Sequence, residues 1–172
     1  MAFQVTDTVA GTQQIDEFQA AIETTPATIL RHPLGTIVRA KDPTLGEGEF
    51  IYLKGVASTT VGSVVEYDTA TFQTGLATVA LDIPTPFAVA MSACVADQYG
   101  WYQISGIATL VKDSGVSLAP AIVIGAAAGI AIAAVTGLAI NGAMVAAVAS
   151  ASATTLSVKV TMNRPHGPPA IA

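Results

Sequence analysis

The side chains best suited to nucleophilic or metal chemistry are few in this sequence. Its 172 residues include two histidines, His32 and His166, and one cysteine, Cys94. His166 lies among prolines and a glycine, where no regular element would orient an imidazole for a catalytic triad or a zinc site. Cys94 follows small and apolar residues, which is typical of a thiol that fills the core. We therefore expect two exposed histidines, a buried cysteine, and no metal or cofactor site.

Acidic side chains are more numerous, but their positions do not indicate acid–base catalysis. Hydrolases that use two carboxylates place them across a cleft. Seven acids of the central region instead lie mostly in predicted surface turns. They are Glu47, Glu49, Glu66, Asp68, Asp82, Asp97 and Asp113. We expect Asp42 and Asp68 to cap turns by accepting backbone hydrogen bonds. The glycine-rich residues 125–129 lack the lysine of a phosphate-binding loop. The sequence therefore predicts a protein that is not an enzyme.

Composition and charge narrow the classes of partner. The net charge is −5, and the seven Lys and Arg residues are spread along the chain without a cluster. A nucleic-acid-binding surface needs a basic patch, so no nucleic-acid partner is expected. Hydrophobic residues make up 52 % of the chain but aromatic residues only 6 %. The predicted core is therefore built mainly from small aliphatic side chains.

Residues 114–158 contain no charged side chain and are mostly apolar. We expect a segment of this kind to be buried, either in lipid or against protein. The window 130–149 approaches the roughly 20 apolar residues of a membrane-spanning helix. Against a helix, glycines divide the segment into short apolar pieces, and no Trp, Tyr or Phe follows Tyr102 to anchor it at a membrane surface. We therefore expect short strands and no membrane partner, and membrane insertion is the third of three hypotheses.

Short apolar runs separated by turn residues predict β-strands along most of the chain. In the central region we expect strands near residues 37–40, 50–55, 63–67, 87–93 and 101–112, with turns at 41–48, 68–71, 84–86 and 99–100. In the uncharged segment we expect strands at residues 121–124, 130–135, 138–140 and 143–148. Asn141 and Gly142 predict a hairpin turn between the last two. Alternation of apolar and polar residues over 156–162 predicts a half-buried final strand.

These elements predict an all-β protein, with a β-sandwich or barrel-like domain and an extended N-terminal arm. We place the arm at residues 1–30, the β domain at 31–165 and a proline-rich C-terminal tail at 166–172. The segment from Arg164 onward is expected to stay outside the sheet, because proline cannot donate a ladder hydrogen bond. The N-terminus has neither the basic stretch nor the apolar core of a secretory signal, which predicts synthesis in the cytoplasm.

The arm carries four acids before the first cation, Arg31, and a short apolar stripe at helical spacing. Such a segment buries too little surface to fold firmly alone and can become ordered on a partner. We predict that it contacts the partner through the apolar residues Ile15, Phe18 and Ile22 and the acidic residues Asp16, Glu17 and Glu23.

The uncharged segment predicts self-association. Soluble monomers rarely expose large apolar patches, so a neighbouring copy is expected to cover this one. We predict a homo-oligomer, with a trimer favoured over a dimer. The candidates for its interface are Ile132, Val145 and Val148.

Residues 49–108 carry a pattern similar to that of a known protein family. The stretch EFIYLKGVAS at residues 49–58 is followed by GSVVEYD at 62–68, PFAVAMS at 86–92 and QYGWYQISGIA at 98–108. Together these stretches resemble the capsid decoration, or head cement, proteins of tailed bacteriophages, and QYGWYQ is the most specific piece. The resemblance covers about a third of the chain. The long acidic arm and the polar-poor segment after residue 114 depart from the family pattern.

The resemblance implies a structural virion protein. Such a protein is made in the host cytoplasm, binds the outer surface of an assembled capsid and bridges neighbouring subunits of the major capsid protein. The alternative hypothesis is a soluble cell-surface or carbohydrate-binding β module. Its support is the aromatic group Tyr99, Trp101 and Tyr102, which would form a sugar-binding platform if the three rings were exposed.

Overall fold

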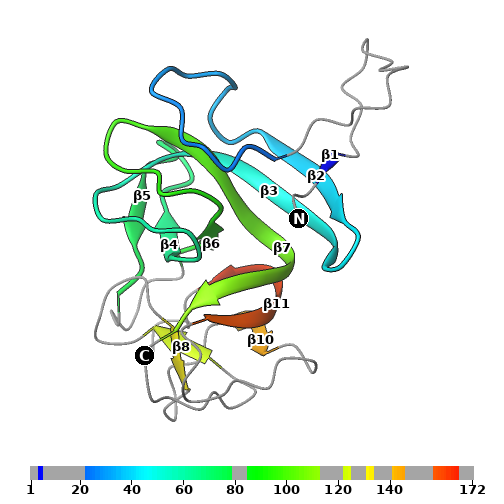
Figure 1. Cartoon of the computed structure of the whole chain (residues 1–172). Helices are drawn as coiled ribbons and strands as arrows, with labels where there is room; N and C mark the ends of the chain where they lie inside the picture. Colours follow the sequence, from blue (N-terminus) through cyan, green and yellow to red (C-terminus); the bar gives the residue numbers. More distant parts are fainter. Residues whose placement is uncertain are drawn as a thin grey trace.

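The computed structural model describes residues 4–5, 22–78, 85–112, 122–124, 131–133, 141–145 and 157–166. All regular elements in these ranges are β-strands (Figure 1), which confirms the predicted all-β class. In chain order they are β1 (Gln4–Val5), β2 (Ile37–Asp42), β3 (Gly46–Lys54), β4 (Val64–Tyr67), β5 (Thr74–Leu76), β6 (Phe87–Ala90), β7 (Tyr99–Val111), β8 (Ile122–Ile124), β9 (Ala131–Ala133), β10 (Asn141–Val145) and β11 (Ser157–His166). Within the same ranges, no helix is long and apolar enough to cross a membrane.

The longest strand, β7, organises the sheet because its two halves pair with different neighbours. Its first half, from Tyr99 to Ser105, pairs with β3. Its second half, from Ser105 to Val111, pairs with β11, and both pairings are antiparallel. Ser105 lies opposite both Glu49 of β3 and Asn163 of β11. Figure 1 shows β7 as a long, bent strand with β3 beside its first half and β11 beside its second.

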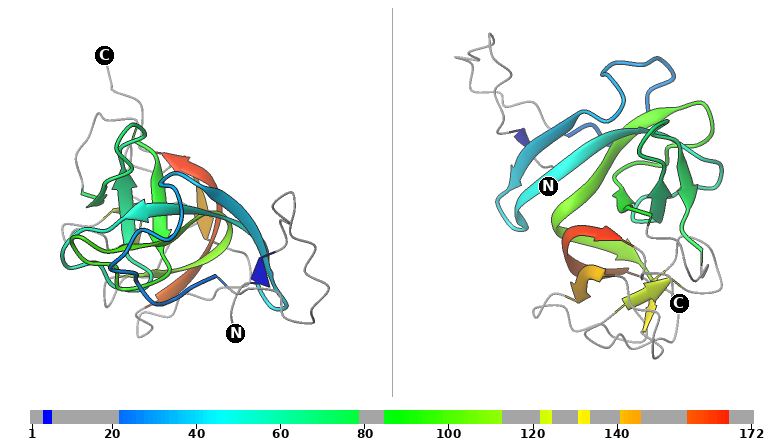
Figure 2. Two further views of the ribbon diagram at one scale, coloured as in Figure 1. Left: turned by 90° about the horizontal axis from the view of Figure 1, so that it is seen from above. Right: turned by 180° about the vertical axis from the view of Figure 1, so that it is seen from behind.

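The other strands extend this arrangement into an open antiparallel sheet of nine strands. Its main path runs β1-β2-β3-β7-β6-β4-β5, and β10 joins through β11. Because the path of the described strands ends at β1 and at β5, the sheet does not close into a barrel. β8 and β9 form a separate antiparallel pair. Figure 2 shows β2 and β3 toward one end of the molecule and β10 and β11 toward the other, with β7 reaching both.

Both faces of the sheet are packed into hydrophobic clusters. In β3, Phe50 and Tyr52 belong to one cluster, whereas Ile51 and Leu53 belong to another, as the two-residue period of a strand requires. All four side chains are at most 3 % exposed. A third cluster joins β4, β6, β7, β10 and β11 through residues that include Val64, Val89, Leu110, Val160 and Met162. Burial on both faces therefore explains the uninterrupted apolar run of β3.

Two turns are capped by acids, as the sequence predicts. Oδ1 of Asp42 accepts hydrogen bonds from the backbone amides two and three residues later, at 2.7 and 2.9 Å. Oδ1 of Asp68 accepts the equivalent pair at 2.8 and 2.6 Å. The amide of Thr71, followed by that of Ala70, holds the pKa of Asp68 below its ordinary value, because these donors stabilise the ionised carboxylate.

One predicted turn is shorter than expected and another is wrong, because their glycines serve close packing. Residues 46–48 belong to β3, and the turn is confined to residues 43–45. A Cβ on Gly48 would lie 3.0 Å from the carbonyl oxygen of Ser105 in β7. Residues 99 and 100 begin β7, and a Cβ on Gly100 would lie 3.0 Å from Oγ of Ser92. Each glycine allows a neighbouring strand or loop to approach the sheet.

The predicted hairpin turn at Asn141 and Gly142 is also wrong. Both residues lie inside β10, and the register with β11 shifts immediately after Asn141. Gly142 does have a positive φ of 77°, but it adopts this conformation in an irregular part of the ladder. His166, predicted to begin the tail, is the last residue of β11 and lies opposite Asn141. The sheet accommodates Pro165 because this stretch of the ladder is irregular and does not need its missing N–H.

The close approach of β3 and β7 can be tested with two glycines of positive φ, Gly106 at 92° and Gly46 at 79°. A Cβ on Gly106 would lie 2.3 Å from the carbonyl oxygen of Glu47 and 2.9 Å from Cα of Gly48, whereas a Cβ on Gly46 would meet nothing within 4 Å. We expect Gly46→Ala to lower the free energy of unfolding by about 1 kcal/mol, the cost of the backbone conformation alone. Gly106→Ala should lower it by about 3 kcal/mol, since backbone atoms must also move. Urea denaturation measures both losses, and equal losses would contradict the close approach.

Candidate functional site

A polar cleft of about 630 Å³ lies where β3, β7 and β11 meet. Residues from four strands line it, namely Arg39 of β2, Glu47, Gly48 and Glu49 of β3, Ser105 of β7, and Asn163 and Arg164 of β11. The cleft therefore forms at the branch of the sheet, where β7 exchanges one neighbour for another.

Glu49 is the centre of an ion cluster in this cleft. Its Oε1 accepts a hydrogen bond from Nε of Arg39 at 3.4 Å. Its Oε2 accepts a hydrogen bond from Nε of Arg164 at 3.2 Å and forms an ion pair with Nη2 of the same residue at 3.1 Å. The Glu49 side chain is 18 % exposed, whereas the side chains of Arg39 and Arg164 are 68 % and 61 % exposed. A sheltered carboxylate therefore orients two guanidinium groups that remain largely in contact with solvent.

The backbone around the cleft is held in an unusual geometry. Nε2 of Gln103, a residue only 1 % exposed, donates to the carbonyl oxygens of Ser105 and Ile107 at 3.0 and 3.2 Å. These bonds satisfy partly buried carbonyl groups at the point where β7 changes partner. Arg164 has a positive φ of 43°, which is uncommon for a residue with a side chain. Strained residues of this kind gather at functional sites, which makes the cleft the candidate site of the described residues.

The chemistry of the cleft suits charge recognition. Its described lining offers two carboxylates and two guanidinium groups, and it contains no His, Lys or Cys beside the hydroxyl of Ser105. Guanidinium groups bind carboxylates through parallel N–H donors. Small-molecule pockets, in contrast, are mostly apolar and enclosed. The cleft is therefore better suited to a charged polypeptide segment than to a small apolar ligand.

Local sequence patterns reveal only half of this cluster. The turn at residues 43–45 sets the register of the β2–β3 hairpin and places Arg39 opposite Glu49. Because Asp42 caps this turn, its predicted cap could have located the turn and so identified the pair. Arg164 lies 115 residues after Glu49 in the chain. No spacing rule connects the two, because their contact depends on the change of partner along β7.

The rings predicted to form a sugar-binding platform are mostly in the core. Tyr102 is 0 % exposed and Trp101 is 5 % exposed, and Tyr99 is partly buried. Tyr52 packs edge-on against Trp101, with ring centroids 5.0 Å apart, and stacks with Tyr99 at 6.5 Å. We call Tyr52, Tyr99 and Trp101 the aromatic cluster. Burial raises the pKa of Tyr52 and the pKa of Tyr102, because desolvation disfavours the phenolate.

The end of the predicted arm is attached to this aromatic cluster. Ile22, predicted to contact a capsid, is 3 % exposed and packs in the same hydrophobic cluster as Tyr52 and Trp101. Ala27 and Tyr99 exchange two backbone hydrogen bonds, each of 2.8 Å. In this structure Ile22 therefore belongs to the core of the β domain.

Charged and aromatic contacts complete this attachment. Glu23, also predicted to contact a capsid, forms a 2.5 Å ion pair with Arg31 across the segment between them. His32 is exposed, as predicted, but its ring centroid lies 5.1 Å from that of Tyr52 and 5.2 Å from that of Trp101. The imidazole therefore covers the aromatic cluster.

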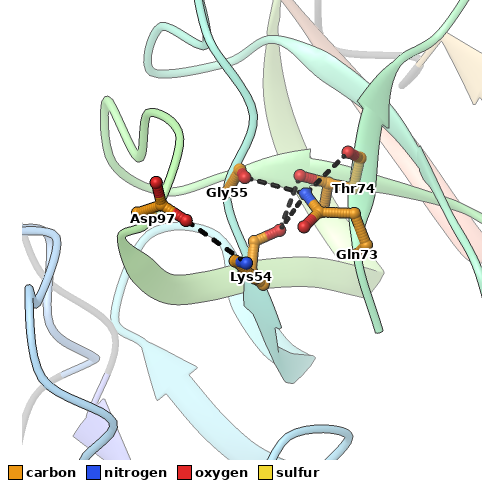
Figure 3. A network of polar contacts seen from close by, with 5 residues as sticks. All are labelled: Lys54, Gly55, Gln73, Thr74 and Asp97. Atoms are coloured by element: carbon orange, nitrogen blue, oxygen red, sulfur yellow. Dashed lines mark hydrogen bonds and ion pairs between the residues drawn. The ribbon is translucent and has the colours of Figure 1, made fainter. Parts of the chain in front are cut away.

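A second polar network joins the ends of β3 and β5 (Figure 3). Nε2 of Gln73 donates to the carbonyl oxygen of Gly55, and Oγ1 of Thr74 donates to that of Lys54, both at 2.8 Å. Nζ of Lys54 pairs with Asp97 at 3.3 Å, and the Asp97 side chain is 91 % exposed. Because the buried members bond to backbone groups and the ion pair is on the surface, this network stabilises loops and offers no recognition site.

The remaining predicted contact residues are only partly described. Five of them, Ile15, Asp16, Glu17, Phe18 and Val148, lie outside the described residues. Ile132 lies in β9, and Val145 lies in β10 opposite Val160. The roles of all seven in contacting a partner stay predictions.

Cys94 is 0 % exposed, which confirms its predicted position in the core. Burial raises the pKa of its thiol, so the reactive thiolate is disfavoured. In the part of the chain that the structure describes, no three His, Cys, Asp or Glu side chains are grouped to hold a metal ion.

Comparisons of the chain with protein-family models, with curated proteins and with solved structures gave no match.

The ion cluster can be tested with a double-mutant cycle on Glu49→Gln and Arg164→Gln. We expect a coupling free energy of about 0.5–1 kcal/mol, at the upper end for ion pairs because the carboxylate is sheltered. The coupling should shrink in 1 M salt, which screens exposed charges. The Lys54–Asp97 pair is the control, since its carboxylate is far more exposed. Urea denaturation of the native protein, the two single variants and the double variant measures the coupling free energy of each pair. A coupling free energy for Glu49–Arg164 no larger than that of the control pair would contradict the proposed role of Glu49.

Proposed function

We propose that this chain is a structural virion protein that binds the outer surface of a tailed-bacteriophage capsid and bridges subunits of the major capsid protein. The observation that carries the proposal is the resemblance of residues 49–108 to capsid decoration proteins. The resembling stretches include β4, β6 and most of β3 and β7, and these strands follow one another in the sheet in the order β3-β7-β6-β4. The resemblance therefore covers one contiguous part of the fold, which supports a shared architecture.

The character of the described surface supports a protein partner. A virion protein needs contact area and repeated assembly and has no need of a catalytic group, and we propose no enzymatic activity for this chain. The cleft around Glu49 presents both signs of charge at the branch of the sheet. Complementary charges of this kind set the orientation and specificity of protein association.

The alternative, a carbohydrate-binding β module, is less well supported. Lectin-like sheets present exposed rings against which sugars stack. Trp101 and Tyr102 are buried, and Tyr99 is partly buried against Tyr52. Binding of the chain to immobilised glycans, together with no binding to capsids, would favour this alternative.

We further propose that the protein is a homo-oligomer, with a trimer favoured over a dimer. The described part of the uncharged segment includes an exposed apolar residue, Met144 of β10, which is 61 % exposed between Ala143 and Val145. A neighbouring copy that covers β10 would remove this side chain from water, with a gain of roughly 25 cal/mol for each Å² of apolar surface.

Co-sedimentation tests the capsid proposal. Capsids assembled from the major capsid protein that accompanies this chain, and lacking the chain itself, are mixed with the purified full-length protein. We expect saturable co-sedimentation and an increase in the temperature at which the capsids disrupt, because the bound protein bridges coat subunits. A chain that stays in the supernatant at every concentration would contradict the proposal.

The charges of the arm are tested in the same assay. Asp16→Asn combined with Glu17→Gln removes two carboxylates and leaves the attachment at Ile22 intact. We expect the affinity for capsids to fall about 3- to 10-fold at low salt, as the loss of one or two ion pairs predicts, and by less at high salt. The matched control, Asp68→Asn with Asp97→Asn, removes two exposed charges from loops of the β domain. Equal losses for the two variants would contradict a specific role of the arm.

The interface at β10 is tested with Met144→Glu. Because this side chain is exposed within one chain, the monomer should fold, but a carboxylate placed in a subunit interface should dissociate the oligomer. Val61→Glu is the control, since Val61 is also about 60 % exposed and lies in a loop outside the uncharged segment. Light scattering measures the mass in solution. An unchanged oligomer mass for Met144→Glu would show that β10 is not an interface.

A further inference from the structure

The outer edge of β2 is only partly covered. Along its other edge β2 pairs with β3 through all six residues, from Ile37 to Asp42. On its outer edge it pairs with β1 through two residues only, with Gln4 opposite Lys41 and Val5 opposite Ala40. No described strand pairs with that edge at Ile37 or at residue 38. An edge of this kind is a template that accepts an added strand.

The strand found on this edge is weakly tied to its own subunit. A hydrogen bond contributes about 0.5–1.5 kcal/mol to stability, so the free energy that holds a ladder of two residues in place is small. Residues 6–21 separate β1 from Ile22, whose side chain is fixed in the core. Sixteen residues can extend over about 50 Å, which exceeds the roughly 40 Å diameter expected for a domain of this size. The connection is therefore long enough for β1 to reach the β2 edge of a neighbouring copy.

Charge complementarity also favours a meeting of the N-terminal segment and this edge. The burial of β2 alternates, with Arg39 and Lys41 exposed on either side of the buried Ala40. The segment that carries β1 has carboxylates at residues 7, 16 and 17 and contains no Lys or Arg. Arg39 is paired with Glu49, so the exposed Lys41 is the cation beside the ladder that attracts an acidic segment, whichever subunit supplies it.

We propose that β1 of each subunit pairs with β2 of a neighbouring copy, so that the N-terminal strands are exchanged within the homo-oligomer. The inference rests on the self-association proposed above and is independent of capsid binding. Exchange of β1 between subunits keeps every hydrogen bond of the β1–β2 ladder, so it costs little free energy. It also links the subunits, because each added strand binds at the high effective concentration that its tether sets. In a closed trimer, each subunit donates one strand and receives one.

Cysteine pairs at Gln4 and Lys41 distinguish exchange from pairing within one chain. These residues lie directly opposite each other in an antiparallel ladder, where paired Cα atoms are about 4.5–5.5 Å apart, a separation compatible with a disulfide. Cys94→Ser removes the native thiol, and the variant is first checked for folding and oligomer mass. Chains with Gln4→Cys only are then co-expressed with chains with Lys41→Cys only and oxidised. A disulfide between these two chains can form only if β1 crosses to its neighbour.

Exchange predicts covalent dimers that contain one chain of each kind, which mass spectrometry of the linked peptides identifies. It also predicts that the double variant Gln4→Cys/Lys41→Cys forms reducible species of the full oligomer mass. Each single variant, oxidised alone, is the control for random cross-linking. A double variant that is an oligomer but gives only monomers with an internal disulfide would overturn exchange and leave self-association intact. A native protein that is monomeric by light scattering would overturn both, and failure to form any 4–41 disulfide would overturn the pairing on which exchange depends.

Discussion

The structure depends on one constraint, which is that the long strand β7 pairs with β3 along its first half and with β11 along its second half. Ser105 pairs with β3 and with β11, and the residue after it, Gly106, has a positive φ and no space for a Cβ. Buried Gln103 donates hydrogen bonds to the carbonyl oxygens of Ser105 and Ile107 on either side of this point. The polar cleft follows from the same event, because the ends of β3 and β11 bring Glu49 and Arg164 together there.

Sequence patterns predict those parts of the fold whose causes are local. The short apolar run predicts the strand near residues 50–55, and acids followed by polar turn residues predict the caps at Asp42 and Asp68. Predictions from local sequence fail at several glycines. Gly48, Gly100 and Gly142 read as turn residues, yet each lies within a strand because a neighbour approaches or the ladder shifts. The three-residue strand β5 has no pattern of its own, and it exists because β4 offers it an edge.

The candidate site and the arm show the same division between local and distant causes. Short-range register accounts for Arg39 opposite Glu49, whereas Arg164 reaches the cleft only through the topology. The apolar stripe of the arm can be read from local sequence, but its last member, Ile22, packs against the aromatic cluster of the β domain. A stripe predicted to face a partner thus supplies one residue to the core. The rings that might have served a sugar platform are used for the same core, so the polar cleft around Glu49 and the exposed Met144 are the candidate recognition features of the described surface.

The central claim is that the chain decorates the outside of a capsid, and a cryo-electron microscopy reconstruction of capsids incubated with the purified protein tests it most directly. The account predicts additional density on the outer surface, at repeated positions between coat subunits, into which the sheet built around β7 can be fitted. Capsids whose reconstruction is identical with and without the protein, or whose added density lies on the inner surface, would contradict it.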